Sequence, residues 1–488
     1  MSVQSTNDIY DWVFRNARII DGTGAPSFVG DLAVRGDQIA AIELPGVIAA
    51  GSGRNEADLA GLALAPGFID AHTHDDRIVL DAPDMVPKIS QGVTTVVVGN
   101  CGISLAPVRF EGAPPPPMNL LGGAEAYQFS TFGDYAAAVH EARPSLNVAA
   151  LVGHSALRLA TMDDITAKAN PAEIADMAAM LTEAMENGAV GWSTGLFYPT
   201  NAGADADEVA ELGRYVARHG GIYATHMRNE FENVLDSIDE SVATAKSAGT
   251  PLVISHHKCA GVENWGRTLE TLPKIEAAAH EHQINFDVYP YTAGSTNLRA
   301  DLITDTYPIM IAWSRPFPEM TGRYLTDIAA GWGIDLDETA ARLQPAGAIY
   351  FQMDEDDVRR VLSSPLSMIG SDGLPHDDHP HPRLWGTFPR VLGHYAREVG
   401  LFDLEIAVHK MTGVTARVFG LTNRGTLAPG KFADLVAFHP DTVRDRATYE
   451  RPTIQSEGIA WVMVNGVMTF APGQSQPGRA GRLVSRAL

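Results

Sequence analysis

Hydrophobic and polar residues alternate in two distinct ways along the chain, and this difference separates its ends from its middle. Near the N-terminus, short runs such as "WVFRNARIID" and "DLAVRGDQIAAIE" are divided by Gly, Asp and Asn, a pattern typical of a small antiparallel β unit. Similar runs return near the C-terminus in "ADLVAFHP" and "GIAWVMVNGVMTF". We therefore predict one small β-sandwich or β-barrel domain built from residues 1–65 and 421–488.

Between these ends, apolar strand-like runs alternate with helical segments. Residues 171–188, "PAEIADMAAMLTEAMENG", begin with Pro and finish with Gly, as expected for a helix. Eight strand candidates occur, the number found in a (β/α)8 barrel. They are "LAPGFIDAHTH", "VTTVVVGNCG", "LNVAALVGHS", "AVGWSTGL", "GIYATHMR", "PLVISHHK", "INFDVYPY" and "SMIGSDG". We predict an α/β protein with a distorted, TIM-like barrel over residues 66–420.

Polar side chains lie at the C-terminal ends of these strand candidates, and in a barrel those ends converge on one mouth. They are His72, His74, Cys101, His154, Ser193, His226, His256, Tyr289 and Asp372. The interval from Tyr289 to Asp372 is too long for a single βα unit. We therefore expect an insertion at about residues 292–350 that serves as a lid or a substrate-binding subdomain.

A metal site is the chemistry that this set of residues favours. His72 and His74 are two apart on an extended segment, so their side chains point to the same side. Such a pair suits a zinc-class metal, although it also occurs as a hydrogen-bonded strand end. The other candidate ligands are Cys101, His226, His256 and Asp372. Together they suffice for one tight and one weaker zinc site. A zinc finger is not indicated, because the ligands are scattered along the chain.

Other charged and polar residues near the predicted mouth have two interpretations each. Lys258 and Arg383 could bind an anionic substrate group, or could pair with neighbouring aspartates. Tyr289 could donate a hydrogen bond to the same anion, or could pack. His154 could have a catalytic or a structural role, and the sequence favours neither. His257 is expected in the core. His376, His379 and His381 are expected on a rim loop, either behind the ligands or at the surface, and Asp75 and Asp76 either behind the ligands or at the rim.

Composition narrows the range of partners. Thirty-six basic residues against 59 acidic ones give a net charge of −23 without a basic patch, which opposes binding to nucleic acid or an anionic membrane. The first residues show no basic segment followed by an apolar run, so no secretory signal is visible. Two cysteines are too few for a disulfide framework, and we expect a cytoplasmic protein. Nothing in the pattern indicates an oligomeric state.

Five segments, in this order, resemble the N-acyl-D-amino-acid deacylases (D-aminoacylases) of the amidohydrolase superfamily: "FIDAHTHDD", "GVTTVVVGNCGISLAP", "YATHMRNE", "VISHHK" and "IGSDGLPHDDHPHPRLWGTFPRVLGHYAR". The resemblance implies zinc at the barrel mouth, with Cys101 in the place of the carboxylated lysine that bridges two metals in most amidohydrolases. It further implies that Cys101, His226 and His256 form the tight zinc site, and that His72, His74 and Asp372 mark the weaker one.

The resemblance also implies the activity: hydrolysis of the amide bond of an N-acyl-D-amino acid, with Asp372 taking the proton of the attacking water and returning it to the amine. It points to four residues as the clamp for the substrate α-carboxylate: Lys258, Tyr289, Arg383 and Ser295. Acid-specific relatives use an arginine in the insertion, and Arg299 in "STNLRADL" comes slightly earlier than that arginine. We therefore expect neutral side chains, such as those of D-methionine, D-leucine or D-phenylalanine.

Three alternatives stay open. The first is a deacylase for N-acyl-D-glutamate or N-acyl-D-aspartate, and the second is a hydantoinase-type cyclic amidase. The third is a catalytically silent relative that binds a ligand or partner. A general base beside metal ligands argues against the third, because a binding module does not need one.

Overall fold

The centre of the protein is a sheet of eight parallel strands in a computed structural model that describes residues 9–474 and 477–486. In sheet order the strands are β18 (Ser367–Ile369), β14 (Ile284–Val288), β13 (Leu252–Ile254), β12 (Ile222–His226), β11 (Gly191–Gly195), β10 (Asn147–Gly153), β7 (Val93–Val98) and β6 (Phe68–Asp70). The two outer strands approach each other, since the Ala71 N–H donates to the Ile369 carbonyl at 3.1 Å. All eight predicted strands, and the barrel they form, are confirmed.

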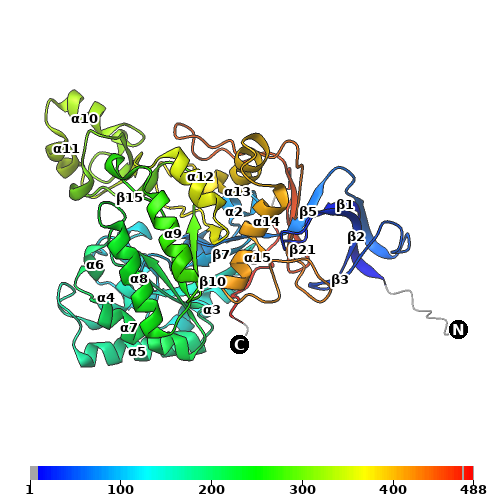
Figure 1. Ribbon diagram of the computed structural model, residues 1–488, viewed down its shortest axis with the longest axis horizontal. Coiled ribbons are helices and arrows are strands. Elements are labelled where there is room, and N and C mark those ends of the chain that lie inside the picture. Colours follow the sequence, from blue (N-terminus) through cyan, green and yellow to red (C-terminus); the bar gives the residue numbers. More distant parts are fainter. Residues whose placement is uncertain (1–8, 475–476, 487–488) are drawn as a thin grey trace.

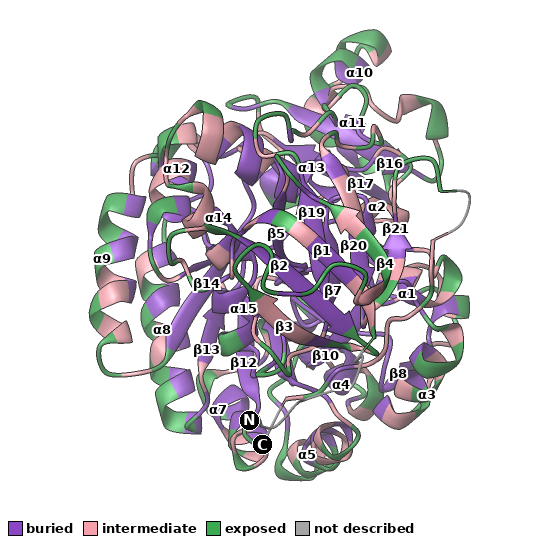
Figure 2. Cartoon of the chain, turned by 90° about the vertical axis from the view of Figure 1, so that its right-hand side faces the viewer, coloured by how far each residue is buried: buried purple, intermediate pink, exposed green. Residues whose placement is uncertain are grey.

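Helices cover the outside of this barrel (Figure 1). The longer ones are α3 (Phe132–Ala142), α4 (His154–Thr161), α5 (Pro171–Glu186), α7 (Ala206–Arg218), α8 (Val234–Ala248), α9 (Thr268–Ala279), α12 (Glu355–Ser363), α13 (Arg383–Arg390), a π-helix (Val391–Glu398) and α14 (Leu404–Met411). The shorter ones are α1 (Ile78–Asp81), α2 (Val86–Ile89), α6 (Pro199–Ala202) and α15 (Gly413–Val418). The strands are buried, whereas the outer faces of helices such as α5, α8 and α9 are exposed (Figure 2).

Among the described residues, no helix combines the length and hydrophobicity needed to cross a membrane.

The predicted helix at residues 171–188 is α5, and local chemistry explains its start. The Asn170 side chain accepts the backbone N–H groups of Ala172 and Glu173, while the Glu173 side chain accepts the Asn170 N–H. Pro171 follows as the first helical residue, where its missing N–H costs nothing.

Strands from both ends of the chain form one second sheet of eight strands. They are β21 (Val467–Phe470), β20 (Ile459–Val464), β19 (Leu435–Phe438), β5 (Ala63–Pro66), β1 (Tyr10–Ile19), β2 (Phe28–Arg35) and β3 (Gln38–Glu43), with β4 (Gly53–Asp58) beside β1. The antiparallel prediction for the N-terminal strands is wrong in part, because β4 and β5 both pair with β1 in parallel. The predicted bounds 1–65 and 421–488 stay a prediction; they include residues 1–8, 475–476 and 487–488, which lie outside the described residues.

A buried polar network joins the second sheet to the N-terminal end of β10. Asp434 contacts Arg424 and accepts hydrogen bonds from the Asn147 side chain and the Asn465 backbone. The C-terminal segment also reaches the barrel, since the Val148 N–H donates to the Arg482 carbonyl at 2.9 Å. The network lies at the end of the barrel opposite the predicted mouth, where a role in stability is expected.

The segment predicted as an insertion folds into a small sheet with its own apolar core. The sheet order is β15 (Gly294–Asn297), β17 (Ala346–Tyr350) and β16 (Ile309–Ser314), and the helices are α10 (Leu325–Trp332) and α11 (Leu336–Leu343). Figure 1 shows α10 and α11 at the end of the molecule far from β1 and β2. Strand β15 and the residues that follow β17 lie at the barrel mouth.

Candidate active site

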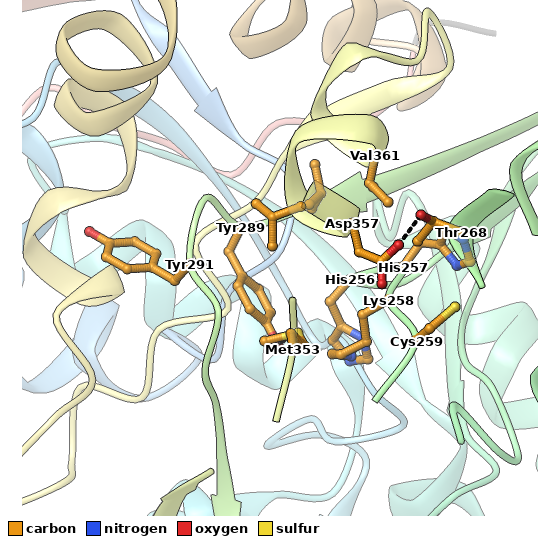
Figure 3. Close-up of a pocket in the computed structure, with 12 residues that line it drawn as sticks. His256, His257, Lys258, Cys259, Thr268, Tyr289, Tyr291, Met353, Asp357 and Val361 are labelled. Atoms are coloured by element: carbon orange, nitrogen blue, oxygen red, sulfur yellow. Dashed lines mark hydrogen bonds between the residues drawn. The ribbon is translucent and has the colours of Figure 1, made fainter. Parts of the chain in front are cut away.

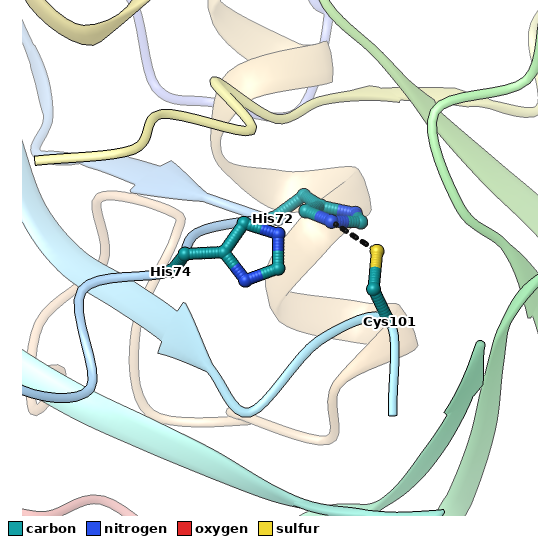
Figure 4. A group of neighbouring side chains, drawn as sticks. All are labelled: His72, His74 and Cys101. Carbon is teal, nitrogen blue, oxygen red and sulfur yellow. Dashed lines mark hydrogen bonds between the residues drawn. The ribbon is translucent and has the colours of Figure 1, made fainter. Parts of the chain in front are cut away.

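The structure gathers the six predicted metal ligands at the mouth of the barrel. His72 and His74 follow β6, Cys101 follows β7, His226 ends β12, His256 follows β13 and Asp372 follows β18. Cys101 lies at the centre, with its Sγ 3.2 Å from His72 Nε2 and 3.4 Å from His256 Nε2. Figure 4 shows His72 and His74 on one side of this sulfur.

The six side chains form three overlapping groups in which the ligand atoms lie within 4.8 Å of one another. The groups are His72, His74 and Cys101; Cys101, His226 and His256; and His72, His256 and Asp372. A thiol, imidazoles and a carboxylate are the donors that zinc takes. Both ring nitrogens of His226 are buried without a hydrogen-bond partner, which is costly unless something else occupies them. The residues therefore fit a zinc-class ion.

Three of these ligands have an unusual backbone conformation. Cys101, His256 and Asp372 have φ values of 56°, 36° and 50°, in the left-handed region that residues other than glycine seldom adopt. Each stands just beyond the end of a strand, where the left-handed turn directs the side chain into the mouth. Such conformations cost on the order of 1–3 kcal/mol each and concentrate at functional sites.

Opposite charges balance one another inside the site. Burial opposes ionisation of Cys101, but His72 and His256 outweigh it and hold the pKa of this thiol well below its usual range. Asp372 is likewise buried, yet Arg383 and His72 hold its pKa well below the ordinary value. Burial lowers the pKa of His74, but Asp372 and Cys101 raise it to about 9. The site thus sets anionic groups among imidazoles, and a bound cation competes with protons for these donors.

Two carboxylates that the sequence pattern did not single out lie behind the histidines. Asp287 accepts from the His256 backbone N–H at 2.9 Å and lies 3.1 Å from His72 Nδ1. Glu230 lies 3.0 Å from His256 Nδ1. A carboxylate behind a metal-binding histidine fixes the ring and its protonation. The sequence did contain a signal for each of these carboxylates. Asp287 interrupts the apolar run "INFDVY", and Glu230 stands four positions after His226.

A cavity adjoins the metal ligands and contains three of the four predicted substrate residues, Lys258, Tyr289 and Ser295. Arg383 lies beside it: its guanidinium stands over the Tyr289 ring at 4.5 Å and donates to the Ser295 carbonyl at 3.3 Å. The Ser295 hydroxyl itself donates to the Ala348 carbonyl at 3.3 Å. Two cations and a phenol thus meet beside the metal ligands, an arrangement that fits a carboxylate.

The rest of the cavity wall is mixed, with Glu230, Thr296 and Gln352 beside hydrophobic side chains, and the insertion supplies part of it. Its hydrophobic and aromatic lining is Leu120, Phe197, Tyr198, Phe231, Leu302, Tyr350 and Leu374. Arg299 is not among the lining residues. Its guanidinium makes two hydrogen bonds to Asp301, at 2.9 and 2.6 Å, and stacks on Phe197 at 4.0 Å.

Comparison with known proteins agrees with this geometry. A family model described as the amidohydrolase family matches residues 55–470. The chain is 50% identical over 483 residues to a D-aminoacylase from Alcaligenes xylosoxydans xylosoxydans, a match that covers 99% of each protein. The chain belongs to the amidohydrolase family. The resemblance inferred from the five sequence segments is thereby confirmed.

Two further relatives of this amidohydrolase act on acidic substrates according to their names. An N-acyl-D-aspartate deacylase from the same organism is 47% identical over 476 residues, with 97% of this chain and 95% of that protein covered. A solved structure of N-acyl-D-glutamate deacylase from Bordetella bronchiseptica, complexed with zinc and a phosphonate mimic of the tetrahedral intermediate, superposes with a TM-score of 0.94 at 48% identity. The match covers 98% of this chain and 100% of that one.

Several other candidate residues of this amidohydrolase lie outside the cavity. The Nε2 of His154 lies 3.0 Å from the Glu208 carboxylate, which accepts its hydrogen bond, and the ring packs on Trp192; His154 thus belongs to a buried network with Arg158 rather than to the site. Ser193 is buried beneath the Cys101 loop, where its hydroxyl donates to the Gly99 carbonyl and accepts the Gly102 N–H.

His257 points to the opposite side of its segment from His256, as predicted. Its Nε2 lies 2.9 Å from the Thr271 hydroxyl, and it lines a second pocket with Cys259, Thr268 and Asp357 (Figure 3). This pocket adjoins the first cavity, because His256, Lys258 and Tyr289 line both. Burial raises the pKa of the Cys259 thiol to about 12. This cysteine is therefore an unreactive packing residue.

Asp75 and Asp76 are buried at 0% and 1% exposure, so of the two expected placements the rim is excluded and a place behind the ligands remains. Beside them, the ammonium of Lys88 donates to Asp70 at 2.8 Å and to the Ser371 hydroxyl at 2.6 Å, and lies 3.3 Å from Asp75. This fully buried lysine ties the first barrel strand to the loop that carries Asp372. Among the rim histidines, His381 is buried and contacts the Ala293 carbonyl at 3.0 Å.

Proposed function

We propose that the protein is a zinc-dependent N-acyl-D-amino-acid deacylase that prefers neutral side chains. The observation that carries the proposal is the meeting of one cysteine, four histidines and Asp372 beside a cavity equipped with Lys258 and Arg383. The D-aminoacylase relative and the zinc-bound N-acyl-D-glutamate deacylase structure support the same reaction class. In this proposal Cys101, His226 and His256 hold the tight zinc, and His72, His74 and Asp372 mark the weaker position.

When bound, zinc supplies a Lewis acid for the amide carbonyl and lowers the pKa of a coordinated water. Asp372 is held as a carboxylate by Arg383 and His72, so it can accept a proton from the attacking water. Water adds to the carbonyl carbon, the C–N bond breaks, and Asp372 returns the proton to the departing nitrogen. The products are a carboxylate and a free D-amino acid.

Lys258, Tyr289 and Arg383 orient the substrate through its α-carboxylate. A carboxylate held at a fixed place relative to the reacting carbonyl allows only one enantiomer to direct its side chain into open space. The other enantiomer directs its side chain into the cavity wall. This arrangement supports selectivity for one hand of the amino acid.

The preference for neutral side chains rests on the cavity wall and on Arg299. Beyond the substrate clamp, the wall carries seven hydrophobic or aromatic residues and the carboxylate of Glu230, and the guanidinium of Arg299 already has a carboxylate partner in Asp301. An acidic side chain would enter the cavity without a free arginine to pair with, and burying an unpaired charge is unfavourable. An acid-specific deacylase is the second candidate, supported by the N-acyl-D-aspartate deacylase relative.

A substrate panel tests these statements. N-acetyl-D-methionine, -leucine and -phenylalanine are assayed beside N-acetyl-D-glutamate, N-acetyl-D-aspartate, the L-isomers and a hydantoin. We expect the highest kcat/KM on the neutral D-substrates and no turnover of L-isomers. Higher kcat/KM on the acidic substrates would replace the neutral preference, and turnover of the hydantoin alone would replace the reaction class.

A further inference from the structure

Glu230 is a buried carboxylate that faces both the metal ligands and the substrate clamp. It is 4% exposed, and its two oxygens each lie 2.8 Å from the ammonium of Lys258. The same carboxylate lies 3.0 Å from His256 Nδ1. It also lies 3.6 Å from His226 Nε2, which is too long for a hydrogen bond but close enough for a charge interaction.

Glu230 and Lys258 together determine which ring nitrogen of His256 carries its proton. The Nδ1 atom has two possible partners, the Glu230 carboxylate at 3.0 Å and the Lys258 ammonium at 2.8 Å. If Nδ1 carries the proton, it donates to Glu230, and the lone pair on Nε2 faces Cys101 and can bind a metal. If Lys258 donates to Nδ1 instead, the ring proton moves to Nε2, which then cannot act as a ligand.

We propose that Glu230 is a positioning residue that selects the metal-binding tautomer of His256 and holds Lys258 in place for the substrate carboxylate. The carboxylate of Glu230, 3.0 Å from His256 Nδ1, favours the proton on that nitrogen, and it draws the ammonium of Lys258 toward its two oxygens and away from His256. A single residue thus links metal binding to substrate binding. The part of this inference that concerns the substrate rests on the proposed deacylase function, whereas the part that concerns the metal does not.

Replacing Glu230 by Gln isolates the effect of the negative charge of this side chain. In Glu230→Gln one oxygen and the negative charge are lost, while the shape of the side chain is kept. Lys258 is only 8% exposed, so its ammonium has little water to turn to. It then donates to His256 Nδ1, and the metal-facing nitrogen becomes protonated. If Lys258 is also replaced by Met, this competing donor is absent, and Nδ1 can again donate to the oxygen of Gln.

The experiment uses four variants of the full-length protein: E230Q, K258M, the double variant E230Q/K258M and E232Q. Glu232 is an exposed residue on the same loop and serves as the matched control. Zinc affinity is measured by competition with a chromogenic chelator, thermal unfolding is measured on the metal-free proteins, and kcat and KM are measured on N-acetyl-D-methionine. The zinc measurement needs no substrate, so it decides the metal part even if the protein does not hydrolyse this compound.

We expect E230Q to bind zinc roughly 10- to 100-fold more weakly than the wild type, and to have a raised KM. K258M should keep zinc affinity within about twofold of the wild type while its KM rises. The double variant should recover zinc affinity relative to E230Q but keep the high KM, and E232Q should match the wild type in every measurement.

Two results would overturn the proposal. Wild-type zinc affinity in E230Q would remove any role of Glu230 in metal binding. A double variant that binds zinc as weakly as E230Q would show that Lys258 does not compete for His256. If E230Q does not fold, the double variant still decides, because it lacks the unpaired ammonium and should fold and bind zinc almost as tightly as the wild type.

Discussion

The guanidinium of Arg383 lies 2.8 Å from the carboxylate of Asp372, and both side chains are buried. This contact joins a predicted substrate clamp to the predicted general base. If the proposed roles hold, the residue that binds the substrate carboxylate also sets the protonation of the residue that moves the proton.

Replacing Arg383 by Met should change both substrate binding and the pH dependence of the reaction. Burial raises the pKa of Asp372 and Arg383 lowers it, so removing the guanidinium raises that pKa. Because the base works only as a carboxylate, the acidic limb of the kcat/KM profile should move to higher pH. KM should rise about 30-fold or more, the cost of breaking a buried charged contact.

The pH–rate profile and the KM of R383M test this expectation directly. Arg323 is an exposed arginine in the insertion, and R323M is the matched control that should leave both unchanged. An acidic limb that stays in place in R383M would contradict the assigned influence of Arg383 on Asp372.

Replacing Asp372 by Asn should separate catalysis from tight metal binding. The amide keeps the size of the side chain but cannot accept the proton of the attacking water. We expect kcat to fall by about 10²- to 10⁴-fold, the usual contribution of a general base. Zinc bound by Cys101, His226 and His256 should remain, as measured by metal analysis of the purified variant. Near-normal kcat in D372N would show that another group acts as the base.

Removing the metal should abolish activity and lower the thermal stability. A ligand present at a thousand times its Kd stabilises the folded state by about 4 kcal/mol, so the chelated protein should have a clearly lower Tm. Added zinc should restore both activity and Tm. Magnesium should restore neither, because it prefers oxygen ligands and this site offers sulfur and nitrogen. Full activity in a metal-free preparation would rule out the proposed chemistry.

Lys410 should make stability depend on pH in the alkaline range. Its ammonium is buried at 3% exposure, donates to the Ser364 carbonyl and the Ser367 hydroxyl, and has its pKa lowered by burial to about 8. Between pH 8 and about 10.5 the unfolded chain binds more protons at this residue than the folded one, so its unfavourable effect on folding fades as pH rises. The effect amounts to about 3 kcal/mol across that window.

The comparison of wild type with K410M isolates this contribution. Below pH 8 the lysine is charged in both states, and the stability difference between the two proteins should be constant. Above pH 8 the wild type should gain on the variant until about pH 10.5. Urea unfolding at a series of pH values measures this difference, and a difference that does not change with pH would show that Lys410 is not perturbed.

The convergence of the candidate metal ligands could be predicted because a barrel gathers its strand ends at one mouth. Cys101 and Asp372 are far apart in the chain, yet each directly follows an apolar run, and topology brings them together. The contacts that hold these ligands could not be predicted in the same way. Lys88 lies on a short helix, and only the closed barrel brings it to Asp70 and Ser371.

The roles of some residues stayed open because the sequence shows where a residue stands on a strand but not which way its side chain points. His154 stands at the end of β10, like the ligands, but its ring turns outward to Glu208. A position at the rim was one expectation for Asp75 and Asp76, because charged side chains are seldom buried. The ammonium of Lys88 permits the burial of Asp75. The cytoplasmic location and the domain bounds stay predictions.

The insertion reaches the metal ligands through aromatic stacking. Arg299 of the insertion stacks on Phe197, and Phe197 stacks on His226 at 4.9 Å with the ring planes only 13° apart. A graft that exchanges this segment for that of another enzyme, in order to change the substrate range, would therefore also alter the packing around a metal ligand. Chimeras of this protein should be judged by their metal content before they are judged by their substrates.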